Sequence, residues 1–242
     1  MRSFGKTFDL IIVCIAIVFI PYISVYLTNL TKTPIHSLDK DGVFLWASVH
    51  HIWQLILSII ITKIYFKSHL RDWGFNFNDK KDALKIVGWF VVIFSLIEVI
   101  GAVAIYFIGG CVKEPIGYPL CFKNILGYYS FEGMLSGTGE EPLFRGFAMT
   151  ILAQSWKGKL RISKIDFSVA GIIAAMLFTF AHISTFPFKS FHFYPLQMLH
   201  AFGLGLLYAV VFQKTKSLFI PIILHNVSNV IMISLPYILL FL

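Results

Sequence analysis

Long apolar stretches separated by short polar connections dominate the chain of 242 residues. About 20 consecutive apolar residues suffice for a helix to cross the hydrocarbon core of a bilayer. The sequence contains seven stretches that approach or exceed this length, and it therefore predicts an all-α bundle of about seven transmembrane helices. The expected spans are residues 8–30, 43–66, 84–109, 127–156, 167–186, 193–213 and 218–242.

The composition strengthens this prediction. Charged residues make up 13% of the chain and hydrophobic residues 57%, whereas soluble domains carry roughly 25% charged residues. We expect a single membrane domain, residues 1–242, with three N-terminal spans in residues 1–126 and the remaining spans in residues 127–242. Although the net charge is +8, the basic residues lie in short connections between apolar stretches. The charge therefore favours a lipid bilayer as the partner and argues against nucleic acid.

The distribution of lysine and arginine predicts the orientation. Most of them fall in the N-terminal leader and in every second connection between spans. Cytoplasmic loops carry such an excess, so we expect a multi-pass protein of the cell membrane with a cytoplasmic N-terminus and an external C-terminus. Cys111 and Cys121 share an expected external loop, where a disulfide and two free thiols are both possible.

The fourth stretch carries two carboxylates and a guanidinium inside apolar sequence. Glu141 and Arg145 are four residues apart with the acid first, the favourable order for a helical ion pair. Glu140 points about 100° away from Glu141 and is left for another task. A charge in a bilayer costs at least ~2.5–3.5 kcal/mol, which makes such a cluster a candidate functional site. A purely structural ion pair would leave Glu140 unexplained.

The same stretch carries residues that disturb a regular helix. Pro142 has no N–H, so it cannot donate a helical hydrogen bond to the carbonyl of Thr138. Gly133, Gly137 and Gly139 leave room for a neighbouring helix. We therefore expect a local opening of the helix, or a close helix approach, around the glutamates.

Two later stretches each carry a pair of residues at helical spacing. Phe178 and His182 lie one turn apart in the fifth stretch, and His225 and Asn229 lie one turn apart in the seventh. By itself, a histidine on an apolar helix is usually a hydrogen-bonded core residue. A polar pair can equally join two helices, which is worth only about 0.6 kcal/mol on average in membranes. Together with Glu140, however, these residues predict a hydrolytic site.

These motifs resemble the signature of the CAAX protease and bacteriocin-processing family, which includes the type II CAAX prenyl endopeptidases and abortive-infection-like proteins. The resemblance covers residues 128–230 and implies an all-helical intramembrane endopeptidase with its catalytic core in residues 127–242. It also implies that Glu140 and His182 activate the attacking water, and that His225 and Asn229 lie near the scissile carbonyl. The motifs are Glu140-Glu141-Pro142-Leu143-Phe144-Arg145, Phe178-Thr179-Phe180-Ala181-His182 and His225-Asn226-Val227-Ser228-Asn229.

The chemistry of these residues is compatible with that role in two ways. A buried glutamate can act as general base, while His225 and Asn229 donate to an oxyanion, which is worth ~3–4 kcal/mol for one good donor. Alternatively, Glu140, His182 and His225 could hold a divalent metal such as zinc with an open water position. The sequence leaves the metal requirement open. The expected substrate is a membrane-associated or lipidated protein or peptide.

Other functions remain possible from the residues alone. Buried Glu, Arg and His residues also serve proton- or ion-coupled transporters, and a helix interrupted by Pro and Gly can form a binding site. A serine–histidine dyad of Ser136 and His200 would leave Glu140 and His225 without a role. A catalytically silent scaffold would be expected to lack one of the catalytic positions.

Overall fold

The computed structural model describes residues 5–76, 80–107, 117–183 and 195–240. They form a helical bundle with one small hairpin, so the predicted all-α class is confirmed. The first half of the chain contains α1 (Lys6–Leu30), α2 (Lys32–Leu38), α3 (Leu45–Phe66), η1 (Leu70–Trp73) and α4 (Lys80–Phe107). The fourth stretch forms α5 (Phe122–Phe131), η2 (Glu132–Ser136), α6 (Gly137–Glu141), η3 (Pro142–Met149) and α7 (Thr150–Ser155). The remaining elements are β1 (Lys159–Ile162), β2 (Ile165–Ser168), α8 (Val169–Ala181), α9 (Pro195–Thr215) and α10 (Phe219–Leu240).

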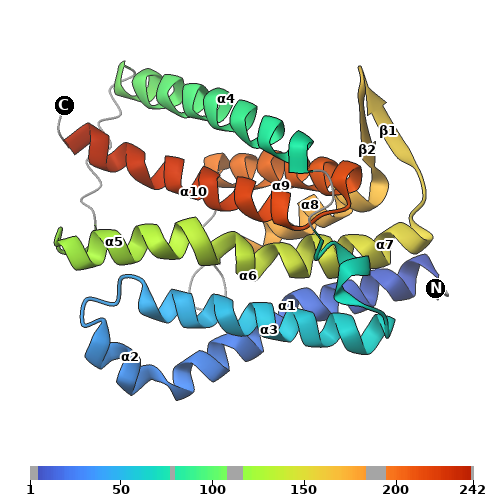
Figure 1. Cartoon of the computed structure of the whole chain (residues 1–242), viewed down its shortest axis with the longest axis horizontal. Helices are drawn as coiled ribbons and strands as arrows, with labels where there is room; N and C mark the ends of the chain where they lie inside the picture. Colours follow the sequence, from blue (N-terminus) through green and yellow to red (C-terminus); the bar gives the residue numbers. More distant parts are fainter. Residues whose placement is uncertain (1–4, 77–79, 108–116, 184–194, 241–242) are drawn as a thin grey trace.

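The helices are arranged around the segments from α5 to α7, which follow one another as a single long helix (Figure 1). On one side of it lie α1, α2 and α3, and on the other lie α8, α9 and α10. The helix α4 lies outermost, next to α10. The fourth stretch thus becomes the centre of the bundle, and helices on both sides of it can contact its polar residues.

Within the described ranges, five helices are long and apolar enough to cross a membrane: α1, α3, α4, α9 and α10. The fourth predicted span is divided into several helical segments, and α8, in the fifth, has only 13 residues. The predicted total of seven spans therefore stays a prediction.

The polar connections contain two elements that the hydrophobic pattern did not predict, the short helix α2 and the hairpin β1–β2. Phe167 and Ser168 were assigned to the fifth span, but they pair with Leu160 and Lys159 in the antiparallel hairpin. The helix begins only at Val169, because the Ser168 side chain accepts a hydrogen bond from the backbone N–H of Gly171 at 3.1 Å. Such a bond satisfies a free donor at a helix start.

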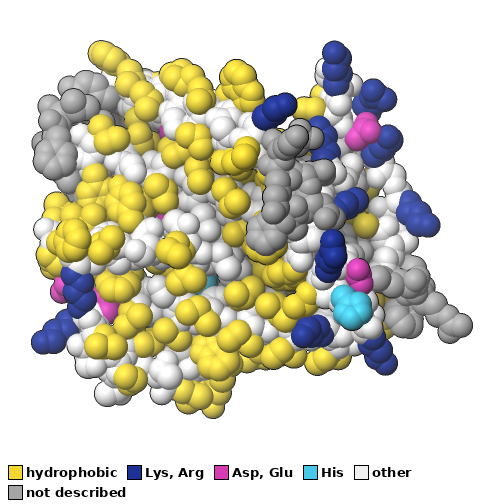
Figure 2. Space-filling view, viewed as in Figure 1, with side chains coloured by type: hydrophobic (Ala, Val, Ile, Leu, Met, Phe, Trp, Pro, Cys, Tyr) yellow, Lys and Arg dark blue, Asp and Glu magenta, His cyan; other side chains and the backbone are white. Residues whose placement is uncertain are grey.

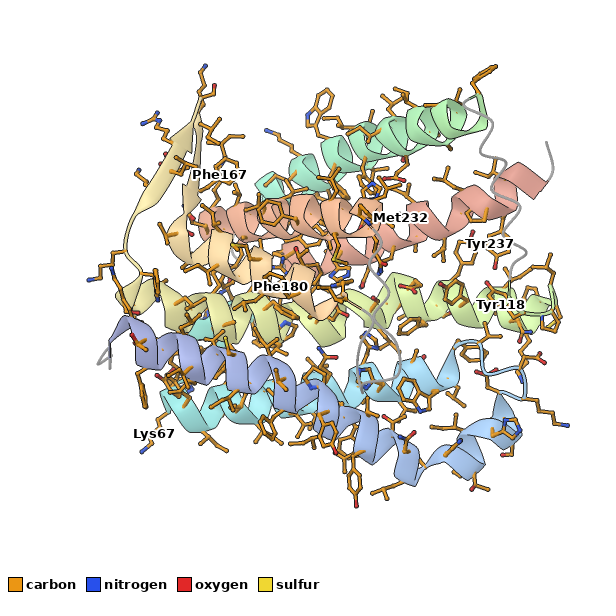
Figure 3. All side chains as sticks on the ribbon, turned by 180° about the vertical axis from the view of Figure 1, so that it is seen from behind. Lys67, Tyr118, Phe167, Phe180, Met232 and Tyr237 are labelled. Carbon is orange, nitrogen blue, oxygen red and sulfur yellow. The ribbon has the colours of Figure 1, made fainter. Side chains whose placement is uncertain are left out.

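The side chains are sorted by position along the bundle. Residues 141–149 are buried without exception, while α1 and α4 expose large apolar side chains such as Phe19 and Trp89. Hydrophobic side chains cover the middle of the visible face, and Lys and Arg gather at the end with the N-terminus and the hairpin (Figures 1 and 2). Lys67 lies at this basic end, whereas Tyr118 and Tyr237 lie at the opposite end (Figure 3). This distribution fits an integral membrane protein whose basic end lies on one side of the bilayer.

Cys121 is exposed near the start of α5. Its expected partner in a disulfide, Cys111, lies outside the described residues.

Candidate active site

The helix that carries the glutamates changes from α-helical to π-helical hydrogen bonding at two places. The segments η2 and η3 are π-helical, and the α-helical segment α6 with Glu140 and Glu141 lies between them. Pro142 is the first residue of η3, which places the second change at the residue that cannot donate a helical hydrogen bond. The expected local disturbance of the helix is confirmed, and π-helical turns occur frequently at functional sites.

Two glycines let neighbouring helices approach α6 closely. A Cβ on Gly137 would lie 2.7 Å from Cβ of His225 in α10, and one on Gly139 would lie 2.8 Å from Cβ of His51 in α3. The backbone N–H of Gly137 also donates to the side-chain oxygen of Asn226 at 2.7 Å. The expected close helix approach is therefore confirmed, and it brings two histidines against the segment with the glutamates.

Glu141 and Arg145 form the predicted ion pair. Arg145 Nη1 donates to Glu141 Oε1 at 2.8 Å, and both side chains are fully buried. The guanidinium also donates from Nη2 to the carbonyl of Gly205 at 3.0 Å. It lies 4.6 Å from the ring centre of Phe178 and 5.4 Å from that of Tyr208, distances typical of cation–π contact. The pair thus joins α6 and η3 to α8 and α9.

His225 is held by the same glutamate. Its Nδ1 donates to Glu141 Oε1 at 2.8 Å, and its ring stacks on Tyr208 with centroids 5.4 Å apart. The Tyr208 hydroxyl is in turn hydrogen-bonded to Ser228 Oγ at 2.7 Å. With Nδ1 occupied, Nε2 is the nitrogen available for chemistry, and it lies 3.9 Å from Glu140 Oε2.

His182 lies directly after the end of α8. Like His225, it directs Nδ1 at a hydrogen-bond acceptor. Its Nδ1 lies 2.8 Å from the carbonyl oxygen of Phe178, and because a carbonyl only accepts, Nδ1 carries the proton. The ring packs against Phe178 with centroids 4.4 Å apart, and the Phe178 ring also meets the edge of His225 at 5.7 Å. Phe178 therefore supports both histidines and Arg145.

Glu140 is the least constrained of the three charged residues in its motif. Its Oε1 lies 3.5 Å from Nε2 of His51, while its Oε2 is buried and has no hydrogen-bond partner among the residues that the structure describes. His51 was not predicted from the sequence as a site residue. The signal that could have found it is the pair His50-His51 inside the second apolar stretch.

Asn229 is close to the other predicted residues but already uses its donors. Its side-chain nitrogen donates to Glu132 Oε2 at 2.8 Å and to Ser136 Oγ at 2.9 Å. An amide nitrogen has two hydrogens, so Asn229 would have to release one of these bonds to contact an oxyanion. The oxyanion role of Asn229 stays a prediction. Glu132 is a second site residue for which the sequence predicted no role.

All four predicted catalytic residues line one cavity of about 410 Å³. Its wall includes Glu140, His182, His225 and Asn229, together with His51 and Glu132. Met232, labelled in Figure 3, also lines it. This cavity is the place where the polar side chains of the bundle converge.

The two members of the alternative serine–histidine dyad also line this cavity, but each has another partner. Ser136 Oγ accepts the hydrogen bond from Asn229, and His200 Nε2 lies 3.0 Å from Glu98 Oε1. These contacts do not favour a role for Ser136 as a nucleophile activated by His200.

The donor types needed for zinc are present, but their arrangement does not form a metal site. His182 and His225 both direct Nδ1 to an acceptor, as metal-binding histidines usually do. Across the described ranges, however, no group of three or more His, Cys, Asp or Glu residues is placed to hold a metal ion. The arrangement therefore gives no support to a metal centre, and the metal requirement stays a prediction.

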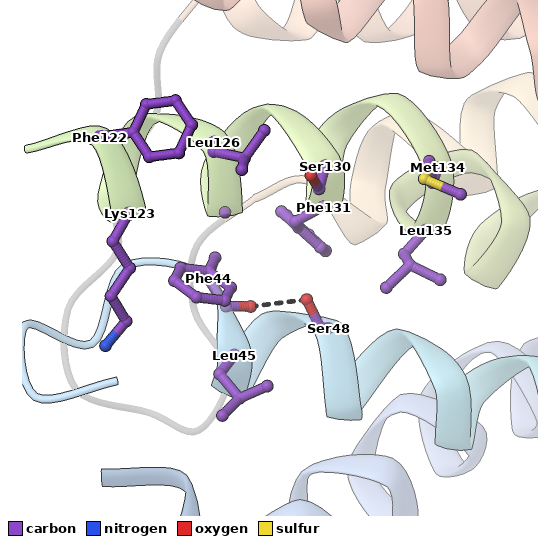
Figure 4. Close-up of a pocket in the computed structure, with 11 residues that line it drawn as sticks. Phe44, Leu45, Ser48, Phe122, Lys123, Leu126, Ser130, Phe131, Met134 and Leu135 are labelled. Carbon is purple, nitrogen blue, oxygen red and sulfur yellow. Dashed lines mark hydrogen bonds between the residues drawn. The ribbon is translucent and has the colours of Figure 1, made fainter. Parts of the chain in front are cut away.

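A second cavity, of about 540 Å³, lies between α3 and α5 (Figure 4). Phe44, Leu126 and Met134 contribute to its largely apolar wall, and Lys123 lies at one end. Although this cavity is larger, it lacks the residues for hydrolysis. Phe131 lines both cavities, so the apolar cavity adjoins the polar one.

Comparison with known proteins gives one match. Residues 123–231 match the family described as type II CAAX prenyl endopeptidase Rce1-like. No curated protein and no solved structure matches the chain. The matched region runs from α5 into α10 and contains all four predicted catalytic residues, whereas His51 lies outside it.

Proposed function

Because residues 123–231 match the type II CAAX prenyl endopeptidase Rce1-like family, we propose that the chain is a member of it and acts as an intramembrane endopeptidase. It hydrolyses a peptide bond of a membrane-associated or lipidated substrate. It does so as a multi-pass protein of the cell membrane, with its basic end in the cytoplasm.

One observation carries the proposal: Glu140 Oε2 is a buried acceptor with no hydrogen-bond partner in the described part of the chain, and it lies 3.9 Å from Nε2 of His225. This separation is too long for a direct hydrogen bond, but a water molecule can bridge polar groups at such distances. A water held there would contact a carboxylate that can accept its proton. The cavity around it is lined by His182 as well.

In the first step, Glu140 accepts a proton from the water while the water oxygen attacks the scissile carbonyl carbon. His182, with its proton fixed on Nδ1, offers the lone pair of Nε2 and helps to orient the water. The carbonyl oxygen becomes negatively charged. For this step both ring nitrogens of His225 carry a hydrogen: Nδ1 stays bonded to Glu141, and Nε2 donates to this oxyanion.

In the second step, the tetrahedral intermediate collapses and the C–N bond breaks. Glu140 returns the proton to the leaving nitrogen, so the carboxylate is restored and the products are a carboxylic acid and an amine. An ionised Glu141 is paired with Arg145 and His225, and an ionised Glu140 lies beside His51 and His225. This pairing limits the cost of placing ions in an apolar environment.

The apolar cavity supports the proposed substrate class. Its wall between α3 and α5 adjoins the polar cavity at Phe131, so a hydrocarbon chain in one can belong to a peptide in the other. The family match gives no support to the transporter alternative, because it describes endopeptidases.

The test is cleavage of fluorogenic membrane peptides, with and without a lipid group, by the purified chain and by Glu140→Gln. We expect Glu140→Gln to keep the fold and lose about 10²–10⁴-fold in kcat, because the general base is removed. We expect the lipidated peptide to be cleaved with the higher kcat/KM.

The same assay includes a chelator and a metal analysis of the purified protein, which test the zinc requirement. Near-normal turnover by a folded Glu140→Gln protein would remove Glu140 from the mechanism. Loss of zinc together with loss of activity would favour the metal alternative.

A further inference from the structure

The N-terminal half of the chain contributes a residue to the candidate active site. His51 belongs to α3 and lies outside the region that matches the family. Nevertheless its Nε2 is 3.5 Å from Oε1 of Glu140, and both side chains are largely buried, with 13% and 18% of their surface exposed. The distance is at the outer limit of a hydrogen bond. Catalytic contacts are often this long without substrate.

The ring of His51 is fixed in its orientation. Its Nδ1 lies 2.9 Å from the carbonyl oxygen of Ala47, which can only accept, so Nδ1 carries a proton. The edge of the ring meets Phe131, with centroids 5.0 Å apart. The backbone of His51 approaches α6 where Gly139 has no side chain. These contacts leave Nε2 directed at Glu140.

This orientation gives the two carboxylate oxygens of Glu140 different roles. An ionised carboxylate and the lone pair of Nε2 repel each other, so the stable arrangement has a hydrogen between Nε2 and Oε1. Since Nδ1 also carries a hydrogen, His51 is then an imidazolium paired with the Glu140 carboxylate. The bond formed by that hydrogen fixes the carboxylate plane. The second oxygen, Oε2, is then presented to the cavity, toward His225.

We propose that His51 is a positioning residue: it holds Oε1 of Glu140 and thereby directs Oε2 at the attacking water. The proposal rests on the proposed function for its effect on catalysis, but the contact itself is independent of that function. Because Nε2 only needs to donate a hydrogen bond, a glutamine at this position can replace it, whereas a leucine cannot.

The experiment measures peptide cleavage by the full-length chain and its variants in detergent. We expect His51→Leu to lower kcat about tenfold to a hundredfold with little change in KM, since small misplacements of catalytic groups cost up to about 10²-fold. His51→Gln should recover most of the activity. The matched control is His36→Leu, because His36 is exposed on α2 and is not among the residues that line the polar cavity; it should stay close to wild type.

Full kcat in His51→Leu, or equal losses in His51→Leu and His51→Gln, would overturn the proposal. A second measurement does not depend on activity: the melting temperatures of His51→Leu, Glu140→Gln and the double variant. We expect shifts that are not additive, because the first change removes the partner of the second. Additive shifts in melting temperature would overturn the contact, even if the wild type cleaved no peptide. Non-additive shifts in a protein that cleaves no peptide would support the contact and reject the proposed function.

Discussion

At the residue scale, Glu141 forms the ion pair with Arg145 that the sequence predicts and also a hydrogen bond with His225 that the sequence does not predict. Its Oε1 accepts from both Arg145 Nη1 and His225 Nδ1, each at 2.8 Å. One buried carboxylate therefore neutralises the guanidinium and fixes the ring orientation of a candidate catalytic histidine. Glu140, one residue earlier, has only longer contacts: its Oε1 lies 3.5 Å from Nε2 of His51, and its Oε2 lies 3.9 Å from Nε2 of His225. Adjacent glutamates thus have different tasks, because Glu141 is bonded to Arg145 and His225 whereas Glu140 also lies beside His51 of α3.

We therefore expect Glu141→Ala and Arg145→Ala to destabilise the protein far more than Glu140→Ala. Removing one member of a buried pair strands the other charge, which typically costs about 3–5 kcal/mol. The measurement is thermal unfolding in detergent. Asp166→Ala is the matched control, because its pair with Lys159 lies on the exposed hairpin and such pairs contribute at most about 1 kcal/mol. Equal melting temperatures for Glu140→Ala, Glu141→Ala and Arg145→Ala would show that the buried pair does not stabilise the protein.

At the scale of elements, the site depends on where helices stop and how closely they approach. The helix α8 has 13 residues, or about 20 Å of length at 1.5 Å per residue. It is thus shorter than a hydrocarbon core of about 30 Å. His182 follows its last residue and can therefore lie at an intermediate depth, beside the π-helical turns that flank Glu140. The segment α6 packs closely against α10 at Gly137, where an added Cβ would lie 2.7 Å from Cβ of His225.

A side chain at Gly137 should disturb this approach. We expect Gly137→Ala to lower stability by about 1–3 kcal/mol through overpacking and to reduce activity, because the new methyl group would displace His225. Gly203→Ala is the control, because a Cβ added at this position in α9 would have no other atom within 4 Å. Alanine there should be neutral or stabilising by up to about 1 kcal/mol. Melting temperatures and cleavage rates that are the same for both variants would contradict the close packing of α6 on α10.

At the scale of the whole molecule, the charge distribution and the arrangement of helices agree. The basic residues gather at the end that carries the N-terminus and the hairpin (Figure 2), while α2 lies at the opposite end (Figure 1). Between them, exposed apolar side chains cover the bundle. The molecule therefore has a preferred orientation in a bilayer.

Labelling of single cysteines tests this orientation. In a background with Cys14, Cys111 and Cys121 replaced by serine, cysteines are placed at Lys40 and Lys164, both exposed. A membrane-impermeant maleimide added to intact cells should label position 40 only, because an excess of lysine and arginine marks the cytoplasmic side. After permeabilisation both positions should react. Labelling of position 164 alone in intact cells would reverse the predicted orientation.

The features that depend on local spacing could be predicted from the amino-acid sequence. Apolar stretches indicated the helices, because burial in a bilayer needs only length and composition. The interval of four residues predicted the pair of Glu141 with Arg145, since such residues share one helix face. The motif residues also identified members of the polar cavity. The hairpin escaped prediction because its short strands fall partly in a polar connection.

Which helix faces meet could be learned only from the packed bundle. The contacts of Glu141 with His225, of Asn229 with Glu132 and of Glu140 with His51 join residues far apart in the chain. Periodicity shows which side chains share a face, but it does not show which face of another helix lies opposite. That choice depends on the packing of complete helices, here on the space left by Gly137 and Gly139. For this reason His51 entered the site only when α3 was packed against α6.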